Sequence, residues 1–400
     1  MCTVNLLRLN LQRLVLYFHI FAVYTVLMKR PLFIFFLPAL WVISLTVSTV
    51  SAQNASGDSY EARLVVGSHA IGGASPLKDK LYGLDLSIQK GIDHINDNWV
   101  RMTGAKAAGL SLVFRDLQFL KGHQDTSANS FGQAYGIAGH MDFRVFKSGS
   151  TSLTLRPGIG LSYLSKTFFT DKRNRFIGSH LNEIIKLDLL FRVPVNSKVD
   201  LTAGAGFLHY SNGGMIIPNG GINMLSASTG LRFKNAVSEK KEYHSNFHQL
   251  NRSNFELNLG IGRRGVFESQ KGLLKSGLYA GYNLYLNEVL TLKSGFDAVY
   301  YYTPFDPAPG RDIQTFQYYG TSYDKWRTGL TLGAEITLWR LALNAQAGKY
   351  LHYDSYYKDI NWFWTTGLTY YLAPRVGVQA KTYFHGNQAD FINYGLVFKI

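Results

Sequence analysis

Hydrophobic and polar side chains alternate with a period of two along most of the chain after residue 53. In residues 185–193 the odd positions are all apolar, and three of the four even positions are charged. Residues 330–338 and 376–381 repeat the alternation, with mainly small or polar residues on the second face. Because successive side chains of a β-strand point to opposite sides, the pattern predicts strands with one apolar and one polar face.

Segments of about ten alternating residues, separated by turns, are typical of an antiparallel outer-membrane β-barrel. A soluble β-sandwich would also alternate, but three features favour the barrel. The polar face carries many small residues, the chain ends on a strand-like run, and aromatic residues cluster near segment ends, as interfacial girdles do. We count about 14 segments, within a range of roughly 12 to 16 strands. The aromatic clusters lie at residues 300–302, 356–357, 362–364 and 370–371.

The N-terminus has the layout of an export signal. Residues 1–52 carry four basic side chains and no acidic one, and an apolar run over 32–50 ends in small residues. A charged start, an apolar middle and a small-residue end are typical of a secretory signal peptide. We therefore interpret residues 28–52 as the signal peptide and 1–27 as an upstream extension. The alternative is one or two membrane helices that stay as anchors.

A polar stretch at residues 235–252 divides the remaining chain into two comparable parts. We expect residues 53–234 to form a barrel half and residues 253–400 to supply strands that complete or extend the barrel. The polar stretch itself would be a long external loop or a connector.

Composition narrows the classes of protein. The chain is 46% hydrophobic and 17% charged, which argues against a disordered chain and a coiled coil. Its single cysteine, Cys2, excludes a disulfide scaffold and a thiolate metal site. With 41 basic and 26 acidic residues, the chain suits an acidic partner such as anionic lipid or lipopolysaccharide. Export argues against nucleic acid, and no metal or organic cofactor is implied.

Residues 260–265 match the dinucleotide-binding pattern G-x-G-x-x-G, but we do not expect them to bind a dinucleotide. That fingerprint requires a helix to follow it, whereas here a strand pattern and a polar turn follow. We therefore interpret these glycines as strand and turn positions.

His209 and Ser211 are two residues apart, so they share one face of a predicted strand. That face continues the apolar parity of residues 199–207, and in a barrel it points at lipid. Polar side chains are costly there, and the pair suits an activated serine that attacks a lipid ester. The alternative is a strand end above the hydrocarbon, at the wet rim, where neither residue carries a cost.

Asn223 opens the next predicted strand on the same outward face. The intervening loop, residues 212–222, holds four glycines and one proline, so its backbone can approach a substrate closely. Three polar side chains therefore converge around one loop.

The run His209-Tyr210-Ser211-Asn212, with residues 218–219 and 221–222, resembles the lipid A 3-O-deacylases (PagL) of the acyloxyacyl hydrolase group. Residues 177–182 add to the likeness, and residues 380–391 are similar to longer members. The likeness is specific around residues 177–233, whereas residues 250–400 exceed the eight-stranded pattern of the small members.

The resemblance implies an outer-membrane barrel that removes the 3-linked acyl chain of lipid A at a site on its outer wall. It assigns Ser211 as nucleophile and His209 as base. Asn223 stands where the family has the glutamate that orients the histidine.

A carboxylate could come from the preceding strand. If the short turn at residues 194–198 sets Val193 opposite Val199, Glu183 faces His209 on the outward side. We hypothesise that Glu183 supplies the charge that Asn223 lacks; the alternative is a rim carboxylate with no partner.

For the oxyanion, the nearest donors are Asn212 and the backbone N–H groups of Gly213 and Gly214. The sequence thus predicts an outer-membrane esterase that removes an ester-linked, 3-O-linked acyl chain from lipid A. The alternative from another class is a non-catalytic barrel, either a pore or a structural protein. A barrel acyltransferase would share the nucleophile but require a second acceptor.

Overall fold

The computed structural model describes residues 58–69, 77, 79–93, 95, 97–121, 129–235, 252–266, 269–302, 325–353, 361–386 and 388–400. The proposed upstream extension, the signal peptide and nearly all of the 235–252 stretch lie outside these residues. Among the described residues, no helix has both the length and the apolar character needed to span a membrane.

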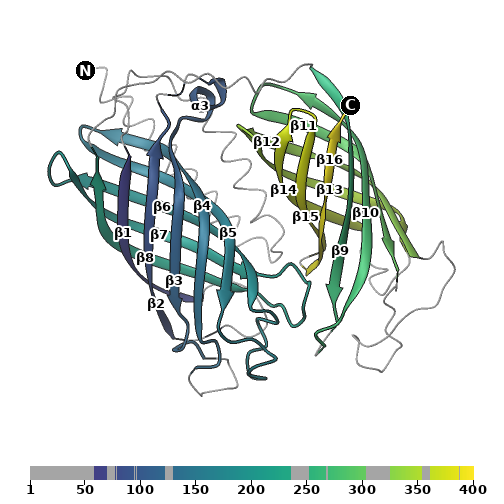
Figure 1. The fold of residues 1–400 in the computed structure, drawn as a ribbon, viewed down its shortest axis with the longest axis horizontal. Helices are drawn as coiled ribbons and strands as arrows, with labels where there is room; N and C mark the ends of the chain where they lie inside the picture. Colours follow the sequence, from purple (N-terminus) through teal and green to yellow (C-terminus); the bar gives the residue numbers. More distant parts are fainter. Residues whose placement is uncertain are drawn as a thin grey trace. The chain divides into compact units, whose positions relative to one another are not determined.

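Sixteen antiparallel strands form two closed barrels of eight strands each (Figure 1). The N-terminal barrel comprises β1 (Ser59–His69), β2 (Lys80–Gly91), β3 (Ala105–Asp116), β4 (Gln133–Ser148), β5 (Thr151–Leu164), β6 (Leu181–Pro194), β7 (Val199–Ser211) and β8 (Ile222–Lys234), with a short helix, α3 (Asn98–Thr103), after β2. The C-terminal barrel comprises β9 (Ser253–Gly265), β10 (Gly272–Tyr285), β11 (Leu290–Tyr301), β12 (Trp326–Leu338), β13 (Leu341–Tyr353), β14 (Trp362–Ala373), β15 (Val376–His385) and β16 (Gln388–Lys399).

The predicted all-β, antiparallel barrel class is confirmed, and 16 strands replace the count of about 14. The first sheet closes through pairing of β8 with β1, before the polar stretch begins. The second closes through pairing of β16 with β9. The strands of residues 253–400 therefore close a cylinder of their own.

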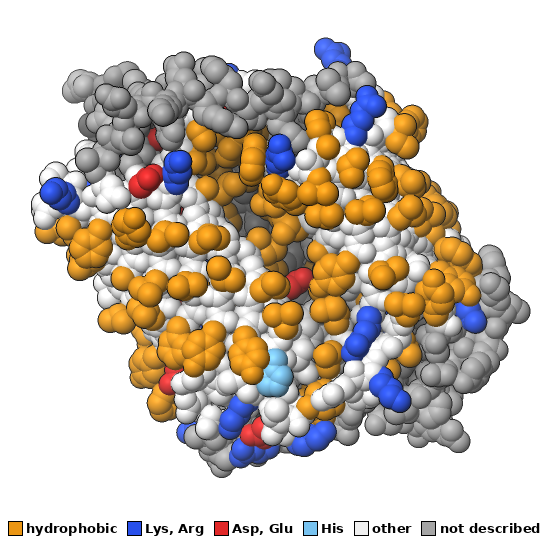
Figure 2. Space-filling model, viewed as in Figure 1, with side chains coloured by type: hydrophobic (Ala, Val, Ile, Leu, Met, Phe, Trp, Pro, Cys, Tyr) orange, Lys and Arg blue, Asp and Glu red, His pale blue; other side chains and the backbone are white. Residues whose placement is uncertain are grey.

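Both barrels are apolar outside and polar inside. In β6 the odd residues 181–193 face outward, and the even residues from 182 to 192 are buried in the interior. On the face shown in Figure 2, hydrophobic side chains cover the strands of each barrel, and most Lys and Arg side chains lie towards strand ends. This distribution is that of a barrel whose outer wall contacts hydrocarbon.

Ion pairs fill the interior of the N-terminal barrel. Asp142 receives hydrogen bonds from Arg156 at 2.6 Å and from Arg192 at 2.8 Å. Arg63 of β1 bonds to Asp188 of β6 at 2.7 Å. Because each buried charge has an opposite partner, the network avoids the cost of an isolated buried ion and braces facing strands against one another.

The C-terminal barrel uses fewer ion pairs and more aromatic rings. Lys293 bonds to Glu256 at 2.7 Å, and Lys275 bonds to Asp390 at 2.8 Å. The Lys275 ammonium also lies 3.7 Å from the centre of the Tyr301 ring. Tyr301 and Tyr371 are buried in the interior, so the aromatic clusters at strand ends do not all form an outer girdle.

The β6–β7 register differs from the sequence prediction by two residues. Val193 pairs with Leu201 rather than with Val199. The side-chain carbonyl of Asn196 accepts hydrogen bonds from the N–H groups of Lys198 (2.8 Å) and Val199 (2.9 Å). These bonds hold Val199 in the turn. Pairing between β6 and β7 therefore begins at Asp200, which pairs with Pro194. The outward parity is preserved, but the cross-strand partners change.

Candidate active site

The end of β7 carries the candidate nucleophile and base on its outward face. Leu208 and Tyr210, which have the opposite parity, are buried in an apolar cluster inside the N-terminal barrel. Ile222 and Met224 of β8 belong to the same cluster. This packing fixes the two strand ends from within, and the side chains of the other parity therefore project from the outer wall.

His209 lies directly opposite Asn223 in the β7–β8 ladder. Its Nδ1 is 2.6 Å from Asn223 Oδ1. An amide oxygen only accepts, so Nδ1 carries the proton and Nε2 keeps a free lone pair. The imidazole is therefore in the tautomer that a general base requires.

Gly221 supports the imidazole from the loop. Its φ is +68°, in the left-handed region, and a Cβ there would lie 2.8 Å from His209 Cε1. A side chain at this position would be strained and would displace the ring. The loop thus uses glycine where the backbone passes against the base.

The Ser211 hydroxyl oxygen accepts two hydrogen bonds. The Gly213 N–H donates to Oγ at 3.1 Å, and the Asn219 Nδ2 group donates at 2.9 Å. With both lone pairs engaged, the hydroxyl proton is the group left for a base. The contacts of the described residues do not include a bond from Ser211 to His209. Bonds between a nucleophile and its base are often long or poorly aligned in proteins without substrate.

Asn212 braces the loop instead of facing the nucleophile. Its side chain is buried, and its Nδ2 donates to Ser179 Oγ at 2.8 Å and to the Ile216 carbonyl at 2.9 Å. Its Oδ1 accepts from the Gly214 N–H at 3.0 Å. Of the three predicted oxyanion donors, only Gly213 points at Ser211; Asn212 and Gly214 bond to each other.

Asn219 is the site residue that sequence reasoning missed. Besides donating to Ser211, its Oδ1 accepts from the Asn212 N–H at 3.1 Å, which fixes the orientation of the amide. The residue stood in the run that carried the family resemblance, but parity could not place it because it lies in a loop.

Glu183 faces outward from β6, as its parity predicts, but it pairs with Ser211. Ile185 occupies the position opposite His209. The prediction that Glu183 directly opposes the histidine is therefore wrong, because the turn moved the register. Glu183 lies diagonal to His209, and Asn223 makes the contact that was assigned to the carboxylate.

The described residues contain no group of three or more His, Cys, Asp or Glu side chains with metal-binding geometry. The site is built from hydroxyl, imidazole and amide groups on two strands and one loop. Such a set suits acyl transfer through a serine.

Two protein-family models match the chain. The family model described as lipid A 3-O-deacylase (PagL) matches residues 95–232, and the model described as acyloxyacyl hydrolase, C-terminal domain, matches residues 253–400. No curated protein gives a significant match to the chain.

Solved structures of barrels are also similar. The outer membrane enzyme PagL is 18% identical, with 42% of this chain and 97% of that chain covered and a TM-score of 0.28. Neisserial surface protein A is 15% identical, with 46% and 100% covered and a TM-score of 0.28. A porin mutant from Rh. blastica is 10% identical, with 86% and 99% covered and a TM-score of 0.17.

The two family models together span more than half of the chain, and one falls on each barrel. The resemblance first visible around His209 and Ser211 is thereby confirmed. The chain belongs to the lipid A 3-O-deacylase (PagL) family of ester hydrolases and is an outer-membrane β-barrel.

Proposed function

We propose that this protein removes the 3-O-linked acyl chain from lipid A by serine catalysis on the outer wall of its N-terminal barrel. The supporting observation is the outward-facing set of Ser211, His209 and Asn223, with two N–H donors converging on Ser211 Oγ. A lipid ester in the outer leaflet would meet this set without leaving the membrane.

In the proposed reaction, His209 Nε2 takes the Ser211 hydroxyl proton as Oγ attacks the ester carbonyl carbon. The imidazolium then gives the proton to the departing sugar oxygen, and the acyl group stays on Ser211. Water, deprotonated by His209, attacks the acyl-enzyme, and the proton returns to Ser211 as the fatty acid leaves. Each proton that His209 takes is given back, so water is the only reactant required besides the ester.

We assign oxyanion stabilisation to the Gly213 N–H and the Asn219 amide. Both groups donate to Ser211 Oγ in the free protein. When Oγ becomes an ester oxygen, its capacity to accept falls, and the neighbouring oxyanion offers these donors a stronger acceptor.

Asn223 orients His209 without bearing a charge. In serine proteases, replacing the orienting carboxylate by an amide costs about 10⁴-fold in kcat, because the histidine takes the wrong tautomer. Here the amide oxygen faces Nδ1, which selects the productive tautomer. We propose that Glu183, diagonal to His209, supplies the missing negative charge through space and stabilises the imidazolium.

Mass spectrometry of lipid A from cells that express wild-type or Ser211→Ala protein tests the proposal. Loss of one acyl chain only with Ser211 intact is the expected result. Ser294→Ala is the matched control, because Ser294 is an exposed serine on the outer wall of the C-terminal barrel. Unchanged lipid A in the wild-type sample, together with ion conductance in planar bilayers, would instead support a pore.

A further inference from the structure

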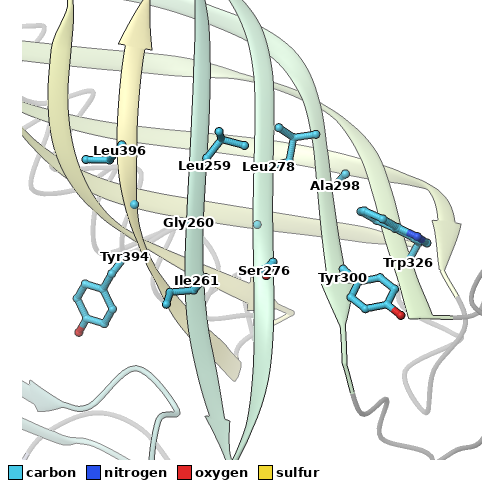
Figure 3. A pocket seen from close by; sticks show the side chains of 12 residues that line it. Leu259, Gly260, Ile261, Ser276, Leu278, Ala298, Tyr300, Trp326, Tyr394 and Leu396 are labelled. Atoms are coloured by element: carbon cyan, nitrogen blue, oxygen red, sulfur yellow. The ribbon is translucent and has the colours of Figure 1, made fainter.

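The outer wall of the C-terminal barrel contains a groove of about 480 Å³ (Figure 3). Two rows of outward side chains line it across five strands. The first row is Leu396, Leu259, Leu278 and Ala298; the second is Tyr394, Ile261, Ser276, Tyr300 and Trp326. The small side chains of Ser276 and Ala298, between larger neighbours, create the depression.

The groove runs towards the external end of the barrel. The connections beyond β11 and β13, residues 302–325 and 354–361, are long, whereas the turns at the opposite end are short. Bacterial barrels carry their long loops outside and their short turns in the periplasm. The leucine row thus lies deeper, and the aromatic row lies nearer the outer surface of the membrane.

A basic residue lies beyond the aromatic row. Arg263 follows Ile261 on the outward face of β9, and its stem passes over Gly272, where a Cβ would clash with the guanidinium Nε. Its Nη2 donates to the Gln270 carbonyl at 2.6 Å, and its buried Nε has no hydrogen-bond partner among the described residues. Lys271 is exposed in the adjoining turn.

The order along the groove is that of an anionic amphiphile: an apolar trough, then hydroxyl and indole groups, then cations. Tyr300 and Trp326 contact each other with ring centres 5.0 Å apart, and Ser276 Oγ lies 3.0 Å from the Tyr302 hydroxyl. Such interfacial aromatics mark the height at which acyl chains join their headgroup. Arginine above them is placed to meet a phosphate by charge-assisted hydrogen bonds.

We propose that this groove binds the anionic glycolipid of the outer leaflet, with one acyl chain between the leucine and aromatic rows and a phosphate at Arg263. Binding there requires no hydrolysis by Ser211, although the Tyr394 hydroxyl at the edge of the groove lies 3.8 Å from the sulfur of Met215 in the 212–222 loop. It gives the C-terminal barrel a lipid-binding role of its own.

A fluorescent probe placed in the groove tests the proposal. Full-length protein with Cys2→Ser and Ser276→Cys is labelled with bimane, which Trp326 quenches at short range, and is titrated with bisphosphorylated lipid A in detergent. We expect a saturable rise in fluorescence as the acyl chain separates the two rings. The same label at Leu343→Cys, on the outer wall away from the groove, should give no saturable signal.

Charge recognition is tested in the same labelled protein. Arg263→Gln should raise the Kd for lipid A by about tenfold, because a charge-assisted contact to phosphate is lost. Arg340→Gln, which removes an arginine in the short turn between β12 and β13, should leave the Kd for lipid A unchanged. Phosphatidylethanolamine should bind more weakly than lipid A.

No saturable signal at position 276, an Arg263→Gln Kd equal to wild type, or equal binding of the zwitterionic lipid would each overturn the proposal. Adding Ser211→Ala should not alter the titration. The experiment thereby distinguishes an absence of lipid binding in the groove from an absence of the proposed hydrolysis.

Discussion

Each polar side chain at the site has at least one identifiable contact that fixes it. His209 has Asn223, Ser211 has two N–H donors, and Asn219 is held by the Asn212 backbone. Function at this scale therefore depends on hydrogen-bond direction as much as on proximity. Single substitutions that remove one contact should affect the rate more than the stability.

Asn223→Ala should lower the rate of lipid A deacylation about 100-fold or more, because the imidazole loses the acceptor that selects its tautomer. Asn223→Glu, which restores the family's residue, should equal or exceed wild type. Deacylation rates in mixed micelles provide the measurement. Full activity in the alanine variant would remove Asn223 from the mechanism.

Asn219→Ala should lower kcat about 100-fold with little change in KM, because an oxyanion donor acts mainly in the transition state. Asn287→Ala is the control, since Asn287 also accepts backbone hydrogen bonds in a turn but lies in the C-terminal barrel. Steady-state kinetics separate kcat from KM. A variant that changed only KM would indicate substrate binding instead.

Glu183→Gln should lower kcat about tenfold, because the imidazolium loses a nearby negative charge. Glu183→Asp, which keeps the charge, should recover most of the activity, whereas a purely structural role would not distinguish charge from shape. An unaltered kcat in the glutamine variant would leave Asn223 as the sole orienting residue.

Strands and turns determine which of these residues can meet. Period-two alternation predicted the barrel class and the outward face of His209, Ser211 and Asn223, because parity survives any register shift of two residues. The same pattern could not predict the partner of Glu183. That depended on the side chain of Asn196, which folds the β6–β7 turn and sets the register.

The side-chain contacts of the loop residues could not be predicted from the hydrophobic pattern either. Periodicity says nothing about where a side chain points in residues 212–222, so Asn212 and Gly214 were assigned to the oxyanion and Asn219 was overlooked. Barrel closure was likewise not encoded in alternation, since a single large barrel and two small ones present the same strands. The pairing of β8 with β1 and of β16 with β9 distinguishes them.

Gly221→Ala should abolish most deacylation while the barrel stays folded, because the new methyl group would push His209 from its position. Gly149→Ala isolates the backbone contribution: Gly149 also has a positive φ, +56°, but a Cβ there meets nothing within 4 Å. Activity assays and heat-modifiable gel mobility should report loss of function only for Gly221→Ala. Equal effects of the two substitutions would mean that backbone strain alone is responsible.

At the scale of the whole molecule, each barrel has an interior filled by buried side chains. In the described part of the N-terminal barrel, buried Arg, Lys, Asp and Glu side chains bond across the interior. This network fills the interior with paired charges, and the proposed site lies on the outer wall. It also makes the cylinder rigid, so the strand ends that carry Ser211 and His209 keep their spacing.

Asp142→Ala should destabilise the protein by about 3–5 kcal/mol, because Arg156 and Arg192 would each lose a buried partner. Asp171→Asn is the control: the Asp171–Arg173 pair lies in a loop, and Arg173 is exposed, so its loss should cost at most about 1 kcal/mol. Urea unfolding in detergent gives both values. Equal midpoints would show that the internal network contributes nothing measurable.

The closure of β8 on β1 also has a consequence for biogenesis. The first cylinder contains all of its own strands by residue 234, so its seam can be sealed without any contribution from the later sequence. Strand β16 seals only the second cylinder, by pairing with β9. The cell's insertion machinery must therefore complete two separate closure events for every copy of this protein that it delivers.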